Sequence, residues 1–224
     1  MALSVDYLYK FSLDLILKNQ SGGLKSTAFA NHWNDAQSTY FDDLVGRFQA
    51  RNNGKEGVNT GLILDETILQ KLSPFTKLLA LTITTGNSDK PVDFVYRLAM
   101  RINGYDAIKI NQGQIAAVNN SVIDPPSIAN NKYYFTEYEN YYSFLPNTVT
   151  AASFDYISNP PDILWAYIQD ADGRQLYDAA NSVQQNWDDM SAREITKRML
   201  TNLGVSFKDP DFMNFGKSVQ MQGE

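Results

Sequence analysis

The chain contains no cysteine and a single histidine, His32. The absence of cysteine excludes disulfides, thiolate metal sites and thiol catalysis. One histidine cannot form a histidine cluster around a metal, and no serine–histidine pair gains support from spacing. His32 lies next to Trp33 in a helical pattern, so we expect it to be an exposed residue or one at the edge of that helix.

Long apolar runs are also missing. No stretch approaches the roughly 20 apolar residues that span a bilayer, and Asp6, Lys10 and Asp14 lie where a secretion signal would be uncharged. We therefore expect a soluble protein, intracellular when it is made, with no membrane partner. The 224 residues, 43% of them hydrophobic, are enough to bury a core.

Basic residues are scarce in the middle of the chain. The net charge is −6, and residues 124–189 hold only Lys132 and Arg174 against ten acids, a balance of −8. The segments on either side, 1–123 and 190–224, are each +1. The acidic block is either an ordinary solvated surface, which we favour, or a surface that repels a polyanion. Both alternatives argue against a protein that grips DNA, because neutralising phosphates needs clustered Lys or Arg.

The first part of the sequence predicts helices. Leu3–Lys18 has an imperfect helical pattern that stops at Gln20-Ser21-Gly22-Gly23. A clearer helix begins at Ser26 or Thr27, and its apolar residues recur every three or four positions: Phe29, Trp33, Ala36, Tyr40, Leu44 and Phe48. Its opposite, polar face includes Asn34. Arg51–Gly61 is expected to be a surface loop, and Asp65 the N-cap of a short helix that ends at Leu72.

After a turn expected at Asn87–Pro91, the period changes to that of strands. Apolar residues from Val92 to Ile102 alternate with polar ones, and Asn103-Gly104 ends this strand with a turn. A short strand at Ala107–Ile110 and a short helix at Gln112–Asn119 follow. The seven aromatic residues of Tyr133–Phe144 are better explained by two strands than by base stacking. Glu137 and Glu139 lie among them, with no base nearer in sequence than Lys132.

The last part predicts three short strands and two helices. The strands are Phe154–Ile157, Ile163–Gln169 and Arg174–Tyr177, with an Asp172-Gly173 hairpin turn before the third. Asp188, Asp189 and Ser191 are candidate N-caps of a helix that ends at Gly204, and Asp209-Pro210 begins another helix.

We therefore predict an α+β fold with N-terminal helices (1–50), a loop-rich helical connector (51–91), an antiparallel, sandwich-like sheet (92–180) and a C-terminal helical hairpin (181–224). These four segments are expected to form one compact domain.

Three kinds of motif suggest a catalytic or binding site, but each lacks a residue or a geometry that such a site needs. Asp170-Ala171-Asp172-Gly173 begins like a calcium loop, but Arg174 stands where an oxygen ligand is needed and Asn181 where a Glu is needed. Gly216-Lys217-Ser218 lacks the earlier glycine of a phosphate loop. The adjacent pairs Asp42-Asp43 and Asp188-Asp189 diverge on a helix, and capping explains the second. We accordingly predict no catalytic, cofactor-binding or metal-binding residue, no cofactor and no enzymatic activity.

Four features in order resemble a family of virion proteins from tailed phages of Bacteroidetes, including the crAss-like phages. They are the Phe29…Ala36-Gln37 helix, the aromatic strand ending at Tyr142–Pro146, the strands around Pro160-Pro161 with Trp165, and the tail from Tyr177 to Gly223. The resemblance implies a structural protein of the virion, made in the bacterial host cytoplasm. It further implies a neck or head-to-tail connector, forming a homo-oligomeric ring with the portal and neighbouring neck or tail proteins. DNA would pass through without specific binding.

Other roles stay open at this point. One is a monomeric virion adaptor or a packaged cargo protein, which would not self-assemble. Another is an intracellular enzyme, whose mark would be a deep pocket with convergent carboxylates of perturbed pKa. For the ring, one hypothesis is that the acidic block lines the lumen, where like charge would keep DNA from sticking.

Overall fold

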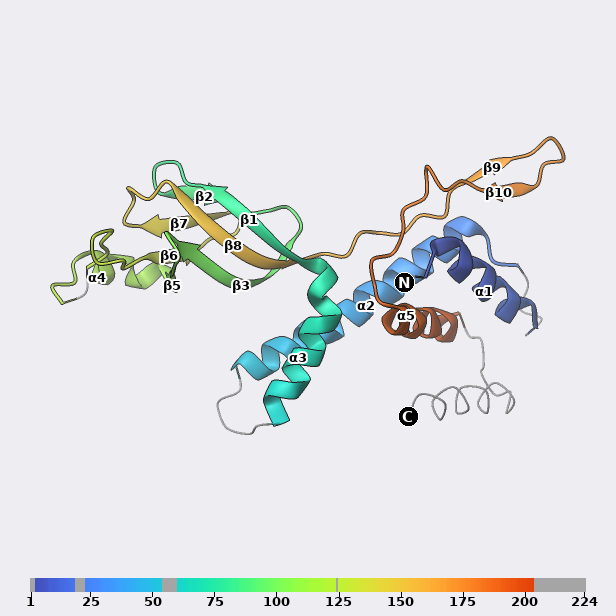
Figure 1. Ribbon diagram of the computed structural model, residues 1–224, viewed down its shortest axis with the longest axis horizontal. Helices are drawn as coiled ribbons and strands as arrows, with labels where there is room; N and C mark the ends of the chain where they lie inside the picture. The colour runs from blue at the N-terminus through green and yellow to red at the C-terminus, as the bar shows by residue number, and fades with distance from the viewer. Residues whose placement is uncertain (1–2, 19–22, 54–59, 124, 204–224) are drawn as a thin grey trace. The chain divides into compact units, whose positions relative to one another are not determined.

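The computed structural model describes residues 3–18, 23–53, 60–123 and 125–203, and it has the predicted α+β fold. The chain forms two compact units rather than the single domain expected. One contains the described residues up to Pro74 and from Pro160 onward, and we call it the helical unit; Phe75–Asn159 form the other, the sandwich unit (Figure 1). The sandwich unit is thus an insertion between two parts of the helical unit.

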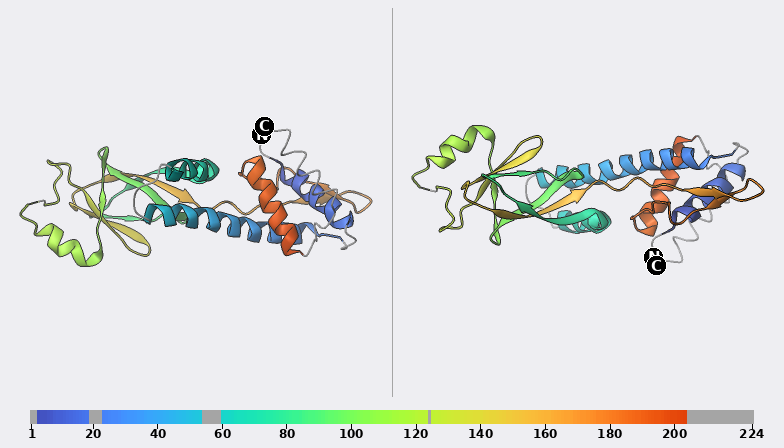
Figure 2. Two further views of the ribbon diagram at one scale, coloured as in Figure 1. Left: turned by 90° about the horizontal axis from the view of Figure 1, so that it is seen from below. Right: turned by 90° about the horizontal axis from the view of Figure 1, so that it is seen from above.

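Four helices build most of the helical unit. They are α1 (Val5–Lys18), α2 (Ser26–Asn53), α3 (Thr60–Leu72) and α5 (Asp189–Asn202). The predicted apolar stripe of α2 is buried along its whole length, and α5 crosses α2 in both views of Figure 2. Of the three predicted N-cap candidates, Asp188 caps α5: its carboxylate accepts hydrogen bonds from the backbone N–H groups of Met190 (2.9 Å) and Ser191 (3.0 Å). None of the helices in the described ranges is both long and apolar enough to cross a bilayer.

Two boundaries in this unit were predicted wrongly. α3 begins at Thr60, so Asp65 lies inside the helix rather than at its N-cap. An aspartate caps a helix only where the residues before it are non-helical, and the apolar run before Asp65 continues the helix. α2 extends through Asn53, into the predicted loop. The predicted stop at Gln20–Gly22, the rest of the loop from 54 to 59, the closure at Gly204 and the helix at Asp209-Pro210 lie outside the described residues.

The chain returns to the helical unit through contacts with polar residues of α2. The amide of Asn34, expected on the exposed face, donates to the carbonyl of Ile163 (3.2 Å) and accepts from its N–H (2.9 Å). Gln37 is buried, donates to the carbonyl of Pro161 (3.1 Å) and accepts from the indole N–H of Trp187 (2.9 Å). These bonds hold residues 161–163 against α2.

Two four-stranded sheets make up the sandwich unit, in the orders β1-β8-β3-β4 and β2-β7-β6-β5. The strands are β1 (Thr76–Thr82), β2 (Asn87–Asp89), β3 (Phe94–Ile102), β4 (Tyr105–Asp106), β5 (Ile108–Lys109), β6 (Tyr134–Glu137), β7 (Tyr141–Leu145) and β8 (Ala151–Ser158). All pairs are antiparallel except β5–β6, which is parallel. One buried cluster takes residues from both sheets, among them Met100, Phe135, Tyr142 and Phe154. The sandwich-like arrangement is therefore confirmed.

The sheet begins earlier than predicted. β1 and β2 lie in the stretch assigned to a helical connector, and β2 occupies the turn expected at Asn87–Pro91. The actual turn is at Thr85-Gly86, where both residues have positive φ (50° and 79°). The run Leu78–Leu81 is too short and too uniformly apolar to distinguish a strand from a helix by its period. The predicted short helix is confirmed as a 3₁₀ turn (Gln112–Gln114) followed by α4 (Ile115–Asn119).

The hairpin predicted at Asp172-Gly173 is formed by β9 (Tyr167–Gln169) and β10 (Gln175–Tyr177). Asp170 shapes its turn by accepting from the N–H groups of Asp172 (2.9 Å) and Arg174 (2.8 Å), and Gly173 supplies a φ of 77°. The strand is shorter than the expected Ile163–Gln169. It also forms a two-stranded sheet in the helical unit instead of joining the central sheet.

Candidate functional site

The described residues contain no group of three or more His, Cys, Asp or Glu side chains placed to hold a metal ion. His32 is exposed, as expected. Asp42 and Asp43 are exposed too, and Asp43 pairs with Arg198 of α5 at 2.6 Å. Asp170 and Asp188 serve a turn and a helix cap. Asp43, Asp170 and Asp188 therefore have structural roles, and the candidate sites that remain are exposed surfaces and charge clusters.

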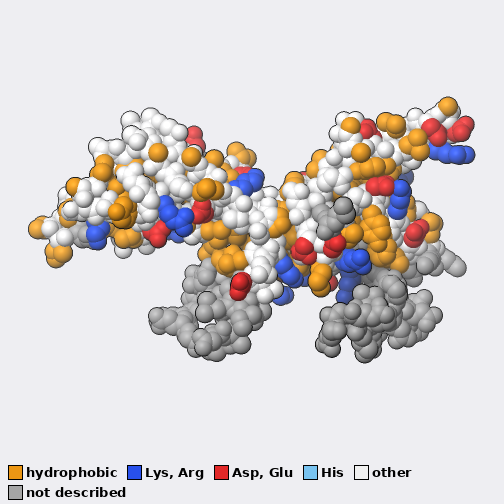
Figure 3. Space-filling view, viewed as in Figure 1, with side chains coloured by type: hydrophobic (Ala, Val, Ile, Leu, Met, Phe, Trp, Pro, Cys, Tyr) orange, Lys and Arg blue, Asp and Glu red, His pale blue; other side chains and the backbone are white. Residues whose placement is uncertain are grey.

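The first such surface is the β9–β10 hairpin, Tyr167–Tyr177, which we call the β-arm. Ile168 and Leu176 are direct cross-strand partners and so share one face, where they are 56% and 48% exposed. Figure 1 shows the β-arm extending away from the helices of its unit, and Figure 3 shows apolar side chains along it with charged ones toward its end. Within the described residues, no third strand pairs with either edge. The β-arm therefore presents an apolar face and two open edges.

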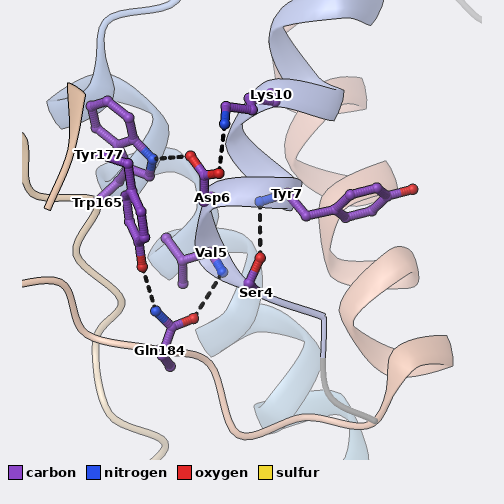
Figure 4. A network of polar contacts seen from close by, with 8 residues as sticks. All are labelled: Ser4, Val5, Asp6, Tyr7, Lys10, Trp165, Tyr177 and Gln184. Carbon is purple, nitrogen blue, oxygen red and sulfur yellow. Dashed lines mark hydrogen bonds and ion pairs between the residues drawn. The ribbon is translucent and has the colours of Figure 1, made fainter. Parts of the chain in front are cut away.

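Its other face is anchored on Trp165. Tyr167 and Tyr177 form the next cross-strand pair, and both rings contact the indole of Trp165, with centroids 5.9 and 5.8 Å away. Trp165 in turn packs on Tyr9 of α1 at 4.5 Å. Its indole N–H donates to the carboxylate of Asp6 (3.1 Å), which also accepts from Lys10 (2.7 Å; Figure 4).

A glutamine completes this attachment. The amide of Gln184 donates to the hydroxyl of Tyr177 (2.5 Å) and accepts from the backbone N–H of Val5 (3.0 Å), as Figure 4 shows. The base of the β-arm is thus bonded to the first turn of α1, although the two are far apart in sequence. A firmly held base with an uncovered apolar face is an arrangement suited to contact with another protein.

The second feature is a charge cluster at one end of the sandwich core, consisting of Lys90, Arg97, Lys109, Glu137 and Tyr142; we call it the Glu137 cluster. Glu137 accepts hydrogen bonds from Lys90 at 2.9 Å and from Lys109 at 2.6 Å, and Arg97 Nη1 lies 3.9 Å from Oε2 of the same carboxylate. Lys90 also lies over the ring of Tyr142 (5.2 Å), and the guanidinium of Arg97 over that of Phe135 (4.7 Å). Three cations therefore surround one carboxylate.

A bulge in β3 brings Arg97 into this cluster. Strict alternation from the buried Met100 would place Arg97 on the outer face, as the sequence pattern predicts. The register shifts between Arg97 and Ala99, and Arg97 pairs instead with the buried Tyr156 on the inner face. The alternating pattern of Val92–Ile102 contains no sign of this shift, so the sequence alone predicts that Arg97 faces solvent.

Burial and charge set the protonation states in the cluster. Burial opposes ionisation of Glu137, but hydrogen bonds from Lys109 and Lys90 outweigh it and hold the pKa of this carboxyl below its usual value. Burial, together with the charge of Glu137, raises the pKa of the Tyr142 phenol well above its usual value. Glu137 is therefore ionised and Tyr142 neutral near pH 7, and neither is poised to exchange a proton there.

Two polar groups of the cluster have no hydrogen-bond partner within the described part of the chain. They are Arg97 Nη1 and the hydroxyl of Tyr142, and both atoms are buried. Glu137 has no base nearer in sequence than Lys132, yet three bases lie around it in the fold. Lys90, Arg97 and Lys109 come from three distant places in the sequence and meet only through strand pairing, so spacing along the chain could not reveal them.

Comparison with known proteins adds no assignment: no protein family model matches this chain, and no curated protein sequence matches it. The grounds for a function are therefore the resemblance in motif order and the two features described above.

Proposed function

We propose that this protein is a structural component of a tailed-phage virion, and that its position is the neck, as a subunit of a head-to-tail connector ring near the portal. The order of motifs from Phe29 to the C-terminal tail supports the class of protein. The β-arm supports assembly. In this proposal the protein is not an enzyme, and DNA passes it without being bound specifically.

The observation that carries the proposal is the exposed apolar face of the β-arm. A two-stranded hairpin is marginally stable by itself in water, and open edges with apolar side chains invite pairing. A subunit of a closed ring needs two different surfaces that contact its neighbours on either side. We assign the β-arm to one of these surfaces, with a second copy of this chain as its partner.

The acidic block gives weaker support to a DNA-conducting lumen. Five of its ten acids have local roles: Glu137 and Asp155 form ion pairs, and Asp170, Asp178 and Asp188 accept backbone hydrogen bonds. Their presence is explained by stability of the subunit. A lumen-lining role therefore rests on the other acids of the block. If these other acids lie on the outer surface of an assembled ring, they do not line the lumen, and the acidic block gives no support to passage of DNA.

Negative-stain electron microscopy and native mass spectrometry of the purified full-length protein test the assembly. We expect closed rings with one subunit number. The double variant Ile168→Asp/Leu176→Asp should release monomers, because it places charges on the apolar face of the β-arm while leaving Trp165 and its contacts in place. The matched control is Val122→Asp/Ile123→Asp, since these two residues are 96% exposed in the sandwich unit and should not affect assembly.

Three results would contradict the proposal. One is a wild-type protein that stays monomeric, also when mixed with particles that lack it; another is its absence from purified virions. The third is equal dissociation by the β-arm variant and the control, which would show that the β-arm is not the contact. Circular dichroism of each variant establishes that it is folded before its assembly is compared.

A further inference from the structure

The Glu137 cluster has more positive charge than its own carboxylate neutralises. Lys90 and Lys109 occupy the oxygens of Glu137 at 2.9 and 2.6 Å, while Arg97 Nη1 lies 3.9 Å from the nearer oxygen, beyond hydrogen-bonding distance. With three cations and one anion, the net charge of the cluster is +2. The guanidinium of Arg97 also lies over the ring of Phe135, 4.7 Å from its centroid, and this contact restricts its position.

Tyr142 supplies an independent sign of a missing acceptor. Its side chain is fully buried, on β7 directly opposite Glu137, and its hydroxyl has no partner within the described residues. A phenol that stays neutral is a hydrogen-bond donor, and so is Arg97 Nη1. A buried donor without an acceptor destabilises the folded state, because it has lost its hydrogen bonds to water and gained none. Two such donors in one cationic cluster call for a group that only accepts hydrogen bonds.

We propose that the Glu137 cluster is a binding site for a small oxyanion, either a phosphate or a carboxylate, held by Arg97 and the hydroxyl of Tyr142. Arginine matches both groups because its planar fork donates two parallel hydrogen bonds to two oxygens. Lys90 and Lys109 favour the anion by charge while they stay bonded to Glu137. The side chain of Arg97 is 26% exposed, so the cluster reaches the surface. This site does not depend on the virion role.

Isothermal titration calorimetry of the full-length protein near pH 7 tests the proposal, with inorganic phosphate in one arm and acetate in the other. Ionic strength is kept constant with chloride, because surface attraction of anions is screened by salt. We expect saturable binding of one anion per chain in at least one arm. The arm with the tighter binding identifies the chemistry of the ligand.

Four variants locate the site. Arg97→Lys keeps the charge but loses the fork, and Tyr142→Phe keeps the ring but loses the hydroxyl; each should weaken binding about tenfold or more, as expected for a hydrogen bond to a charged group. Glu137→Gln should bind the anion more tightly, because it raises the net charge of the cluster. The control Arg101→Lys lies on the same strand, paired with Asp155 and Asp106, and should bind like the wild type.

No saturable heat with either anion would overturn the proposal and leave ordered water as the acceptor for both donors. Equal affinity in the wild type, Arg97→Lys and Tyr142→Phe would also overturn it, because binding would then be elsewhere. Arg97→Lys and Tyr142→Phe are conservative in shape. If one of them fails to fold, the other and Glu137→Gln decide the question.

Discussion

At the scale of single residues, buried polar side chains join segments of the chain that are far apart in the sequence. Gln37 illustrates this, because it joins α2 to two segments more than a hundred residues away, at Pro161 and Trp187. The sequence predicts that Gln37 lies in a helix, because it follows Ala36 of the apolar stripe. Its burial results from the later segments that pack around it.

We predict that Gln37→Leu lowers the free energy of unfolding by about 1–3 kcal/mol, because the indole N–H of Trp187 and the carbonyl of Pro161 lose their partner while the volume is nearly kept. Urea unfolding measures this as a lower midpoint with an unchanged slope. Asn31→Leu, at an exposed position of the same helix, is the control and should have little effect. Similar losses in both variants would contradict the role given to Gln37.

A second residue-scale prediction concerns alkaline pH. Burial, and the hydrogen bond that the Tyr156 hydroxyl donates to Asp93 (3.0 Å), raise the pKa of Tyr156 from 10.0 to about 12. The folded state therefore favours the neutral phenol, and this contribution to stability is full below pH 10 and is lost as pH rises through about 12. Tyr156→Phe should be less stable than the wild type near neutral pH, and the difference should narrow above pH 10. Denaturant unfolding over a pH series measures the difference, and a constant gap would contradict the prediction.

At the scale of elements, tight turns connect the strands of the sandwich, and glycines with positive φ make them possible. Gly86 (φ 79°) lies between β1 and β2, and Gly104 (φ 84°) between β3 and β4. A methyl group at Gly104 would meet no atom within 4 Å, whereas at Gly86 it would lie 3.1 Å from Cβ and 3.2 Å from Cα of Asn147. The two turns therefore share backbone strain and differ in space.

We predict that Gly104→Ala costs about 1–2 kcal/mol of folding free energy, the price of a left-handed conformation for a residue with a Cβ. Gly86→Ala should cost clearly more, because backbone of Asn147 must also move. Thermal and urea unfolding of the two variants give the comparison directly. Equal losses would show that the loop around Asn147 yields without cost.

At the scale of the whole molecule, the two units differ in how they are built from the chain. The sandwich unit is one continuous segment whose first and last strands pair, with Thr76 opposite Ile157. The helical unit needs two segments, since Trp33 of α2 donates to Thr196 of α5 (3.2 Å) and both are buried. Because the sandwich unit is one continuous segment, we expect it to fold independently. Neither segment of the helical unit should fold alone, because each lacks the other's side of the core.

We predict that residues 75–159, expressed alone, fold with a cooperative thermal transition and dispersed amide signals in an NMR spectrum. Residues 1–74 alone should not, because the apolar stripe of α2 would lose α5 and Trp187. Far-UV circular dichroism and NMR of the two fragments make the comparison. A disordered 75–159 fragment would mean that the sandwich core depends on the helical unit.

Features that depend on residues a few positions apart could be predicted from the sequence. The stripe of α2, the cap at Asp188, and the turns at Asn103-Gly104 and Asp172-Gly173 are of this kind, because helix period, capping and turn conformation are local properties. The α+β class follows from their order along the chain. Composition alone also excluded disulfides, thiolate metal sites, thiol catalysis and histidine clusters, because the chain has no cysteine and one histidine.

Only the tertiary structure decided the features that depend on distant residues. The division into two units, the assignment of β1 to an edge strand, and the shift that turns Arg97 inward all result from pairing between segments tens of residues apart. The Glu137 cluster and the anchoring of the β-arm at Asp6 follow from that pairing. Their physical cause is packing and strand register, which local sequence patterns do not record.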